Sequence, residues 1–321
     1  MKDIKFYIGP MTKNIVEAVI NYCEYNDYKI GLIPSRRQID YDGGYVGWNT
    51  KDFLRYVKAK TGKVIVERDH SGIGQGYSYD NGVMSQYSDA LHGMDMIHVD
   101  PWKKYRKYQD GLRETIDNIR FINSVNDKCL FEVGTEESIR RFETDEFENF
   151  LYDLKKELGD VFYKIKYGVI QSGTGLLGTE NVGTFNIDRC VDMSKICKNF
   201  GLLSKEHNGD YLTNNEISMR FDNGLDSINI APEFGVFETK LIMEHIKDND
   251  IYDKIYDICY KSNRWVKWVD DRFVPEDNKD KLIEICGHYV NDEIKKLSGI
   301  DDKIIISKLI EEIDKLINLK K

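Results

Sequence analysis

The stretch KVIVERDHSGIG, from Lys63 to Gly74, contains the pattern on which the fold assignment depends. Its first part, Lys63–Val66, has the composition of a buried β-strand, and it ends at four ionisable residues, 67–70. Burying unpaired charges is costly, so ionisable residues at a strand end are usually solvated, paired or kept for chemistry. Helical patterns flank this strand at Thr50–Lys60 and Asn81–Leu91, so the stretch is predicted to be the strand of a β-α unit.

The same alternation of strand and helix continues on both sides of this unit, over about 245 residues. The predicted strands are Lys5–Ile8, Lys29–Ile33, Lys63–Val66, Met94–Val99, Cys129–Val133, Tyr167–Ile170, Leu202–Lys205 and Ser227–Ile230. The predicted helices are Thr12–Glu24, Thr50–Lys60, Asn81–Leu91, Lys104–Val125, Asp145–Leu158, Arg189–Asn199, Asn214–Asp222 and Phe237–Lys247. Eight β-α units in this length predict an α/β fold, a closed (β/α)8 TIM barrel. An open doubly wound sheet would need a glycine-rich phosphate turn after an early strand, which IGPMTKN does not supply.

The pattern changes after Asp248, where only amphipathic helical spacing remains. We therefore predict a barrel over residues 1–248 and a C-terminal helical extension over residues 249–321. The extension is expected to pack on the barrel or on a subunit interface, where Trp265 and Trp268 would contribute apolar surface.

Composition narrows the class of partner. The formal net charge of −9 argues against binding the phosphate backbone of nucleic acid, which requires many lysines and arginines. No apolar run is long enough to span a membrane, and the first residues lack the zones of a signal peptide, so a cytoplasmic protein is expected. The six cysteines form no C-x-x-C pair and are interpreted as reduced core residues.

Polar residues gather where the predicted strands end, which is where barrels of this kind hold their catalytic residues. In chain order they are Arg36, Arg37, Gln38, Asp69, His70, His98, Asp100, Glu132, Glu136, Gln171, Ser172, Gly173, Lys205, Glu206, His207, Asp210, Asn229 and Glu233. A lone histidine after a strand is more often structural than a ligand. Three of the six histidines nevertheless fall on this one rim, and the convergence favours a functional site.

Two histidines and several carboxylates, with no cysteine nearby, suit a divalent metal such as zinc with an open position for substrate. Such an ion would polarise a carbonyl oxygen or stabilise an enediolate, while a carboxylic acid moves the proton. Asp69 beside His70 has the composition for these two roles. Successive strand residues point to opposite faces, but the predicted strand has ended here, so a loop can aim both inward.

Anion binding has two candidate locations. The segment SGTGLLGTENVG, from Ser172 to Gly183, offers backbone amides that could hold a phosphate, although glycine also simply permits tight turns. Arg36 and Arg37 are candidates for the same anion or another one, and equally for surface salt bridges.

An ordered set of short blocks carries a family resemblance: GGYVGWNTKDF (Gly43–Phe53), then ERDHSG, IHVD, VGTE, VIQSG and KEHNGDYLT. Together they cover about residues 30–245. In this order they resemble the family of D-tagatose-bisphosphate aldolase companion subunits, which is related to the class II, metal-dependent ketose-bisphosphate aldolases and to ketose 4-epimerases.

The resemblance implies a (β/α)8 barrel that acts on phosphorylated or free ketoses by aldol chemistry. It implies that His70 and His207 bind the metal, that Asp69 transfers the proton, and that Glu132 or Glu136 is the carboxylate of the site. The sequence departs from the pattern at two positions. Class II aldolases have a ligand histidine at the position of Gln171, whereas the companion subunits resemble this chain there. Glu233 stands where the companion subunits have a small neutral residue.

These considerations give one predicted site. Its metal ligands are His70, Glu132, Gln171 and His207; its catalytic residues are Asp69, Asp100 and Glu136; and its substrate contacts are Arg36, Arg37, Gln38, Ser172, Gly173, Lys205, Asn229 and Glu233. The metal is predicted to be zinc and the ligand a small sugar phosphate. A homo-oligomer and a partner aldolase subunit are both open as protein partners.

The predicted function is that of a metal-dependent enzyme that acts on a ketose (bis)phosphate by aldol or retro-aldol chemistry. A ketose-phosphate 4-epimerase would use the same site by cleaving, rotating and re-forming one C–C bond. A sugar isomerase would need the same polarised carbonyl and base. The alternative from a different class is a non-catalytic subunit that stabilises a separate class II aldolase.

Overall fold

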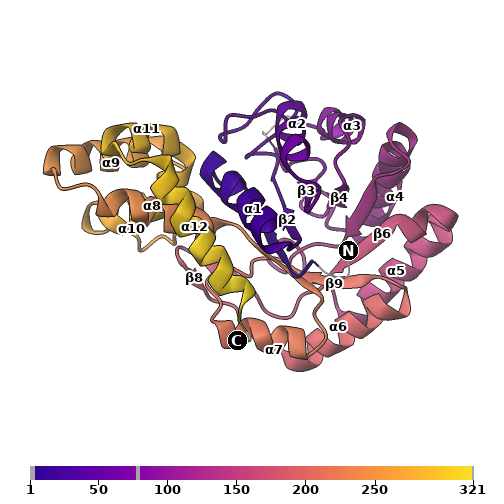
Figure 1. The fold of residues 1–321 in the computed structure, drawn as a ribbon. Coiled ribbons are helices and arrows are strands. Elements are labelled where there is room, and N and C mark those ends of the chain that lie inside the picture. The colour runs from indigo at the N-terminus through magenta and orange to yellow at the C-terminus, as the bar shows by residue number, and fades with distance from the viewer. Residues whose placement is uncertain (1–3, 77–79, 320–321) are drawn as a thin grey trace.

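The computed structural model describes residues 4–76 and 80–319. Eight parallel strands form a closed barrel in chain order, and the last strand pairs with the first (Figure 1). The barrel strands are β1 (Phe6–Ile8), β2 (Ile30–Leu32), β3 (Val64–Ser71), β4 (Met96–Val99), β5 (Leu130–Val133), β6 (Ile165–Val169), β9 (Leu203–Glu206) and β10 (Ser227–Ile230). The predicted (β/α)8 TIM barrel is confirmed.

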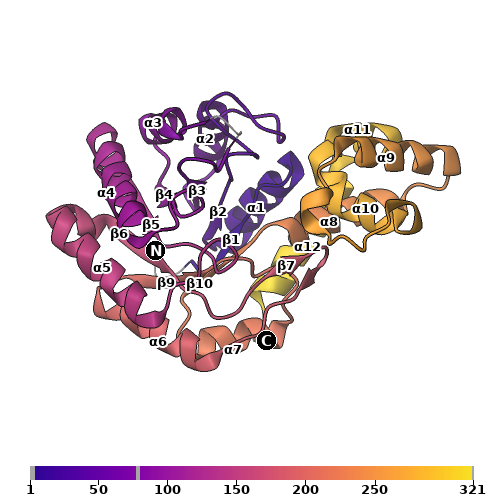
Figure 2. The same ribbon diagram turned by 180° about the vertical axis from the view of Figure 1, so that it is seen from behind.

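Helices surround this barrel on the outside (Figures 1 and 2). They are α1 (Lys13–Asn26), α2 (Thr50–Lys60), α3 (Val83–Leu91), α4 (Tyr108–Val125), α5 (Thr144–Leu158), α6 (Ile187–Asn199), α7 (Asn214–Asp222) and α8 (Pro232–Glu244). A 3-10 helix, η1 (Gly159–Lys164), leads into β6, and a small antiparallel hairpin, β7 (Leu176–Leu177) with β8 (Glu180–Asn181), lies between β6 and α6.

All the predicted strands and helices are present, but two helix starts differ by several residues. Helix α4 begins at Tyr108 rather than at Lys104, and α8 begins at Pro232 rather than at Phe237. Proline has the backbone angle of a first helical residue and lacks the amide hydrogen that would be unpaired there. Pro232 therefore marks the start of α8 within the segment that was predicted to be a loop.

The prediction that β3 ends at Val66 is wrong, because the strand continues to Ser71. Glu67 and Arg68 lie within it and are fully buried, since each has a buried partner of opposite charge. Arg68 makes two hydrogen bonds to the Asp89 carboxylate of α3, of 2.7 and 2.8 Å. Glu67 contacts Lys205 of β9 inside the barrel. Paired charges thus replace the apolar residues that usually mark a buried strand.

The barrel interior has an apolar layer below a charged one. The apolar layer is formed by Ile4, Tyr7, Ile65, Met96, Leu130, Tyr167 and Leu203, several of which are the first residues of their strands. The charged layer follows further along the strands, where Lys205 lies between the carboxylates of Glu67 and Glu132. The apolar layer closes the barrel at one end, so the charged layer can be reached from solvent only at the C-terminal ends of the strands.

The chain after α8 contains only helices in the described residues. They are α9 (Asn249–Ser262), η2 (Val266–Trp268), η3 (Pro275–Asp277), α10 (Lys279–Cys286), η4 (Gly287–Val290), α11 (Asn291–Ser298) and α12 (Asp302–Ile317). The helices α9 to α11 stand beside α8 at one side of the barrel, and α12 lies along α1 (Figures 1 and 2). Asn14 and Tyr22 of α1 hydrogen-bond to Asp302 and Asp314 of α12. None of the helices in the described residues has the length and apolar composition needed to cross a lipid bilayer.

Candidate metal centre and active site

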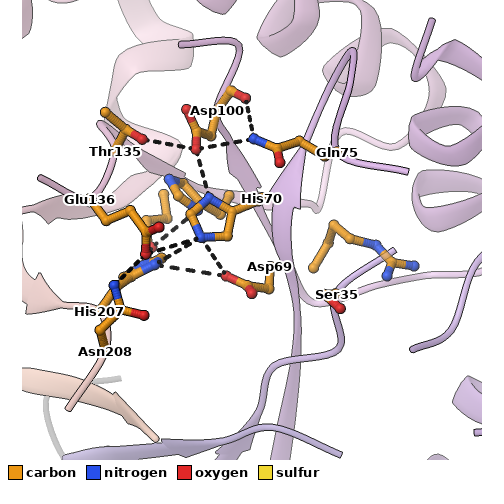
Figure 3. Close-up of polar contacts among 12 residues, drawn as sticks. Ser35, Asp69, His70, Gln75, Asp100, Thr135, Glu136, His207 and Asn208 are labelled. Carbon is orange, nitrogen blue, oxygen red and sulfur yellow. Dashed lines mark hydrogen bonds and ion pairs between the residues drawn. The ribbon is translucent and has the colours of Figure 1, made fainter. Parts of the chain in front are cut away.

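Four potential metal ligands meet at the C-terminal ends of the barrel strands. Three of them, Asp69, His70 and His207, are labelled in Figure 3. Asp69 and His70 come from β3, His98 comes from β4, and His207 directly follows β9. One ligand atom from each of the four lies within 4.8 Å of those of the other three. Each imidazole is also held by a hydrogen bond from its other ring nitrogen.

The ring of His70 is fixed by Asp100, whose Oδ2 lies 2.6 Å from Nδ1 (Figure 3). Asp100 also accepts hydrogen bonds from the Thr135 hydroxyl and the Trp102 amide. Burial acts to raise the pKa of Asp100, but the hydrogen bond with His70 and the nearby charges leave it lowered. The carboxylate of Asp100 is therefore the acceptor, and Nδ1 of His70 is the donor. The Nε2 atom of His70 is left to face the cluster.

The ring of His207 is fixed in the opposite sense. Its Nε2 lies 2.7 Å from Glu132 Oε1, and Glu132 Oε2 lies 2.8 Å from the buried ammonium group of Lys205. Burial acts to raise the pKa of Glu132, but the charge of Lys205 outweighs it and keeps that pKa low. The carboxylate of Glu132 therefore accepts a hydrogen bond from Nε2 of His207. The Nδ1 atom of His207 faces the cluster, 3.3 Å from Nε2 of His70.

His98 completes the set of three imidazoles. Its Nε2 lies 3.1 Å from the carbonyl oxygen of Gly134, while Nδ1 has no hydrogen-bond partner within the described part of the chain. Burial lowers the pKa of His98 to about 4, so the ring is neutral at physiological pH. Oδ1 of Asp69 is likewise buried, and it too lacks a hydrogen bond to any described residue.

The residues present fit a bound cation. The two nitrogen atoms that face each other in His70 and His207 both carry lone pairs when their other nitrogens donate. Lone pairs at 3.3 Å repel each other unless a proton or a metal ion lies between them. Although burial opposes protonation, the carboxylates around His70, Asp69 foremost, raise its pKa to about 10, which shows that the surroundings favour positive charge.

The consecutive residues Asp69 and His70 reach the same site because β3 is irregular at this point. The pairing of β3 with β4 shifts register between Arg68 and Ser71, and His70 has a φ of +44°. Side chains alternate between the two faces of a regular strand, and an inserted residue breaks that alternation. The sequence predicted that both side chains face inward, but the device is a bulge inside the strand and not a loop after it.

A pocket of about 250 Å³ opens above this cluster. It is lined by Met11, Ile33, Ser35, Arg36, Arg37, Gln38, Tyr45, Asp69, His70, Gln75, Lys103, Glu136, Leu176, His207, Asn208, Asp210, Asn229, Ala231, Pro232, Lys267, Trp268 and Tyr289. Glu136 accepts a hydrogen bond from the Asn208 amide, and its Oε2 lies 3.8 Å from Nε2 of His70. The volume is slightly below the roughly 300–1,000 Å³ of sites for drug-sized ligands, which favours a small metabolite.

Several predicted site residues lie elsewhere. Gln171 is outside the cluster, because its amide bonds to the Thr135 and Arg140 carbonyl oxygens and accepts the Phe142 amide proton. Glu132 supports His207 rather than facing the cluster. Lys205 is fully buried between two carboxylates, which leaves it no access to a substrate.

Of the remaining residues predicted to contact substrate, some are bonded within the protein and others line the pocket. The hydroxyl of Ser172 bonds to Glu206, the carbonyl oxygen of Gly173 accepts from Arg220, and Glu233 accepts the Tyr211 amide proton. In the glycine-rich loop, the backbone amides of Gly175, Gly178 and Val182 donate hydrogen bonds within the protein, so they are not free to hold a phosphate. Arg36 lines the pocket but is ion-paired with Asp40 and Asp80. The pocket wall also includes Arg37, Gln38 and Asn229.

Two groups of candidate site residues were missed by the sequence reasoning. His98 was placed on the rim but was not assigned as a ligand, although its position at a strand end matched that of the two assigned histidines. Lys103, Lys267 and Tyr289 also line the pocket. Lys103 lies in the loop after β4, so its place near a strand end was the available signal. No sequence pattern marks Lys267 and Tyr289, because tertiary packing alone brings the C-terminal helices to the barrel mouth.

No protein-family model and no curated protein sequence matches this chain. Solved structures do match its fold. A probable tagatose 6 phosphate kinase from Sinorhizobium meliloti 1021 has a TM-score of 0.71 at 14% identity, over 98% of this chain and 92% of the other. The fructuronate-tagaturonate epimerase UxaE from Cohnella laeviribosi has 0.65 at 10% identity, over 99% and 81%. The YdjI aldolase from Escherichia coli K12 has 0.55 at 12% identity, over 94% of each chain. At these identities the likeness establishes the fold, and it agrees with the resemblance drawn from the sequence blocks.

Proposed function

We propose that this chain is a metal-dependent enzyme of carbohydrate metabolism that makes or breaks a C–C bond of a ketose phosphate by aldol chemistry. The observation that carries the proposal is the cluster of Asp69, His70, His98 and His207 at the base of the pocket. Solved structures with this fold include an aldolase and a sugar-acid epimerase, which supports the same class of reaction.

The three imidazoles would hold the metal in this proposal. Neutral histidine nitrogens with one carboxylate nearby are typical zinc ligands, and three protein ligands leave a coordination position for substrate. The hydrogen bonds to Asp100, Glu132 and Gly134 orient the rings, as the groups behind metal-binding histidines usually do. When bound, such an ion supplies a Lewis acid that polarises the carbonyl group of the substrate.

Asp69 is the proposed proton-transfer group. Aldol cleavage requires a base that removes the proton from the hydroxyl group β to the carbonyl, and the electrons of the broken C–C bond then form an enolate. Asp69 lines the pocket, and its Oδ1 has no hydrogen-bond partner within the described residues. Glu136, which also lines the pocket, is the second candidate, whereas Asp100 is committed to His70. These assignments place the proton transfer on carboxylates and leave the imidazoles as ligands.

A ketose-phosphate 4-epimerase is the alternative for the same site. It would retain the aldehyde after cleavage, rotate it and re-form the bond, so it needs no further catalytic group. The epimerase with this fold, which aligns with nearly the whole chain, favours this alternative as a specific candidate. We place either enzyme in the cytoplasm, with a small sugar phosphate as its ligand. It would act alone, as a homo-oligomer or together with a separate aldolase subunit.

The first test is the metal content of protein that is purified without a metal-affinity tag. We expect about one zinc or other divalent ion per chain, with loss of the ion in His98→Ala and in His207→Ala. The matched control is His245→Ala, because His245 is exposed at the end of α8 and outside the cluster. Retention of the ion by both cluster variants would refute the site.

The metal-loaded protein is then assayed with ketose phosphates. Release of an aldehyde that a trapping reagent captures identifies an aldolase, while C4 inversion without a released aldehyde identifies an epimerase. A stoichiometric metal with no turnover, together with co-purification of an aldolase chain, would instead support the stabilising-subunit alternative.

A further inference from the structure

The pocket wall contains three cationic side chains that come from distant parts of the chain. Arg37 follows β2, Lys103 follows β4, and Lys267 lies in η2 of the C-terminal helices. Within residues 4–76 and 80–319, none of the three has an ion pair or a side-chain hydrogen bond to a carboxylate. Arg36, the fourth lysine or arginine in the pocket lining, is by contrast paired with Asp40 and Asp80.

The three cations lie within electrostatic reach of one another. The charge of Arg37 lowers the pKa of Lys103, after the larger effect of desolvation. Desolvation, and then the charges of Arg37, Arg264 and Lys103, lower the pKa of Lys267 to about 8, although its side chain keeps contact with solvent at the pocket mouth. Like charges held together without ion-pair partners destabilise the folded state, so they indicate a site for an anion.

The anionic groups near this wall do not neutralise it. Asp100 and then Glu136 act on the pKa of Lys103, and Glu136 acts on that of Lys267, but neither carboxylate pairs with a lysine. Asp100 hydrogen-bonds to His70, and the oxygens of Glu136 accept hydrogen bonds from Asn208 and Ser138. Lys267 instead packs over aromatic rings, with Nζ 4.1 Å from the ring centre of Trp268 and 5.6 Å from that of Tyr289. The rings hold the ammonium group at the pocket without cancelling its charge.

We propose that Arg37, Lys103 and Lys267 form the subsite for the terminal anionic group of the sugar substrate, and that the C-terminal helices belong to the active site for this reason. The inference deepens the proposed function and rests on it for the sugar. The metal cluster and the three cations line one pocket, so a substrate would present its carbonyl to the former and its anionic group to the latter. Phosphate and carboxylate share the chemistry that this subsite requires, and the dianionic phosphate matches three cations better.

The subsite is tested by calorimetric binding of small probes to the metal-loaded protein. The probes are glycerol 3-phosphate, glycerate and glycerol, which carry a phosphate, a carboxylate and no charge on the same three-carbon chain. We expect glycerol 3-phosphate to bind and glycerol not to bind. Lys103→Gln and Lys267→Gln should each weaken phosphate binding by about tenfold or more, the usual effect of losing a charge-assisted hydrogen bond.

The matched control is Lys261→Gln, an exposed lysine of α9 whose charge is paired with Asp257. It should bind glycerol 3-phosphate as the unchanged protein does. If glycerate rather than glycerol 3-phosphate depends on the two pocket lysines, the subsite stands and its ligand is a sugar acid. If neither anion binds, or if both bind equally well to the pocket variants and the control, the subsite is refuted.

This outcome is separable from that of the proposed function. Metal content should be unchanged in Lys103→Gln and Lys267→Gln, because neither lysine is part of the histidine cluster. Loss of anion binding with full metal content would support the subsite by itself. Phosphate binding in a protein that never holds a metal would support the subsite and count against the aldolase.

Discussion

At the residue scale, the candidate centre depends on which nitrogen of each imidazole is free. His70 presents Nε2 because Asp100 holds Nδ1, whereas His207 presents Nδ1 because Glu132 holds Nε2. His98 has Nδ1 free because a backbone carbonyl oxygen holds Nε2. The acceptors behind the rings therefore decide the geometry of the site as much as the histidines do.

Replacing Asp100 by asparagine should weaken metal binding by about 10- to 100-fold, because the variant keeps an oxygen but loses the charge that orients His70. The affinity is measured by competition with a chromophoric chelator. Asp110→Asn is the matched control, since Asp110 is an exposed partner of Arg113 on α4. Equal metal affinity in Asp100→Asn and the control would contradict the supporting role of Asp100.

The sequence predicted the first residues of this centre but not the direction of every side chain. Asp69, His70 and His207 were recognised because they follow apolar strands, and the structure brings them together. Gln171 follows a strand in the same way, yet its amide donates to backbone carbonyl oxygens of the loop after β5. A position at a strand end fixes the rim on which a residue lies, whereas hydrogen bonds across loops decide where it points.

At the element scale, β3 shows how a strand can carry charges into a barrel wall. Arg68 faces outward to Asp89 of α3, and Glu67 faces inward to Lys205. A pattern search ends the strand at Val66 because it cannot see that partners lie on α3 and β9. The same search placed the other strands and, apart from the starts of α4 and α8, the barrel helices, because their buried faces are apolar.

Arg68→Met should lower the free energy of unfolding by about 3–5 kcal/mol, because it leaves the carboxylate of Asp89 buried without its cation. Denaturant titration measures the change. The double variant Arg68→Met/Asp89→Leu should recover part of the loss, since no buried charge remains.

The comparison variant for Arg68 is Arg113→Met, whose exposed ion pair with Asp110 should contribute less than about 1 kcal/mol. A loss as small in Arg68→Met as in Arg113→Met would show that the buried pair does not stabilise β3.

At the scale of the whole molecule, the pocket is assembled from segments that the sequence separates widely. The extension after residue 248 was expected to pack on the barrel or a second subunit, and no pattern in it predicted a contribution to the site. In the structure, Lys267, Trp268 and Tyr289 reach the barrel mouth and face Arg37 and Lys103. Only the complete fold reveals this combination.

The affinity for glycerol 3-phosphate should therefore fall as the pH rises from 7 to 9. Lys267 is charged below its pKa of about 8 and loses its charge above it, while a phosphate monoester, with a second pKa near 6, stays dianionic throughout. The other charged groups that face Lys267 are Arg37, Arg264, Lys103 and Glu136. Calorimetry at several pH values measures the trend, which Lys267→Gln should reduce. Asp210 of the same pocket, whose pKa burial raises to about 8, gains negative charge over this range and accounts for the remaining trend. A flat profile in the unchanged protein would exclude a role for this titration.

The position of α12 along α1 has a consequence for how the protein folds during synthesis. Asn14 and Asp302, which hydrogen-bond across these helices, are 288 residues apart, and β1 likewise waits for β10 to close the barrel. A ribosome releases the chain from the N-terminus, so the first helix emerges long before its neighbour has been made. Helix α1 can pack on β2 and β3 soon after they are made, but its side that contacts α12 must stay uncovered, or be shielded by chaperones, until residues Asp302–Ile317 have been made. The packing of α1 is therefore completed only after the whole barrel has been synthesised.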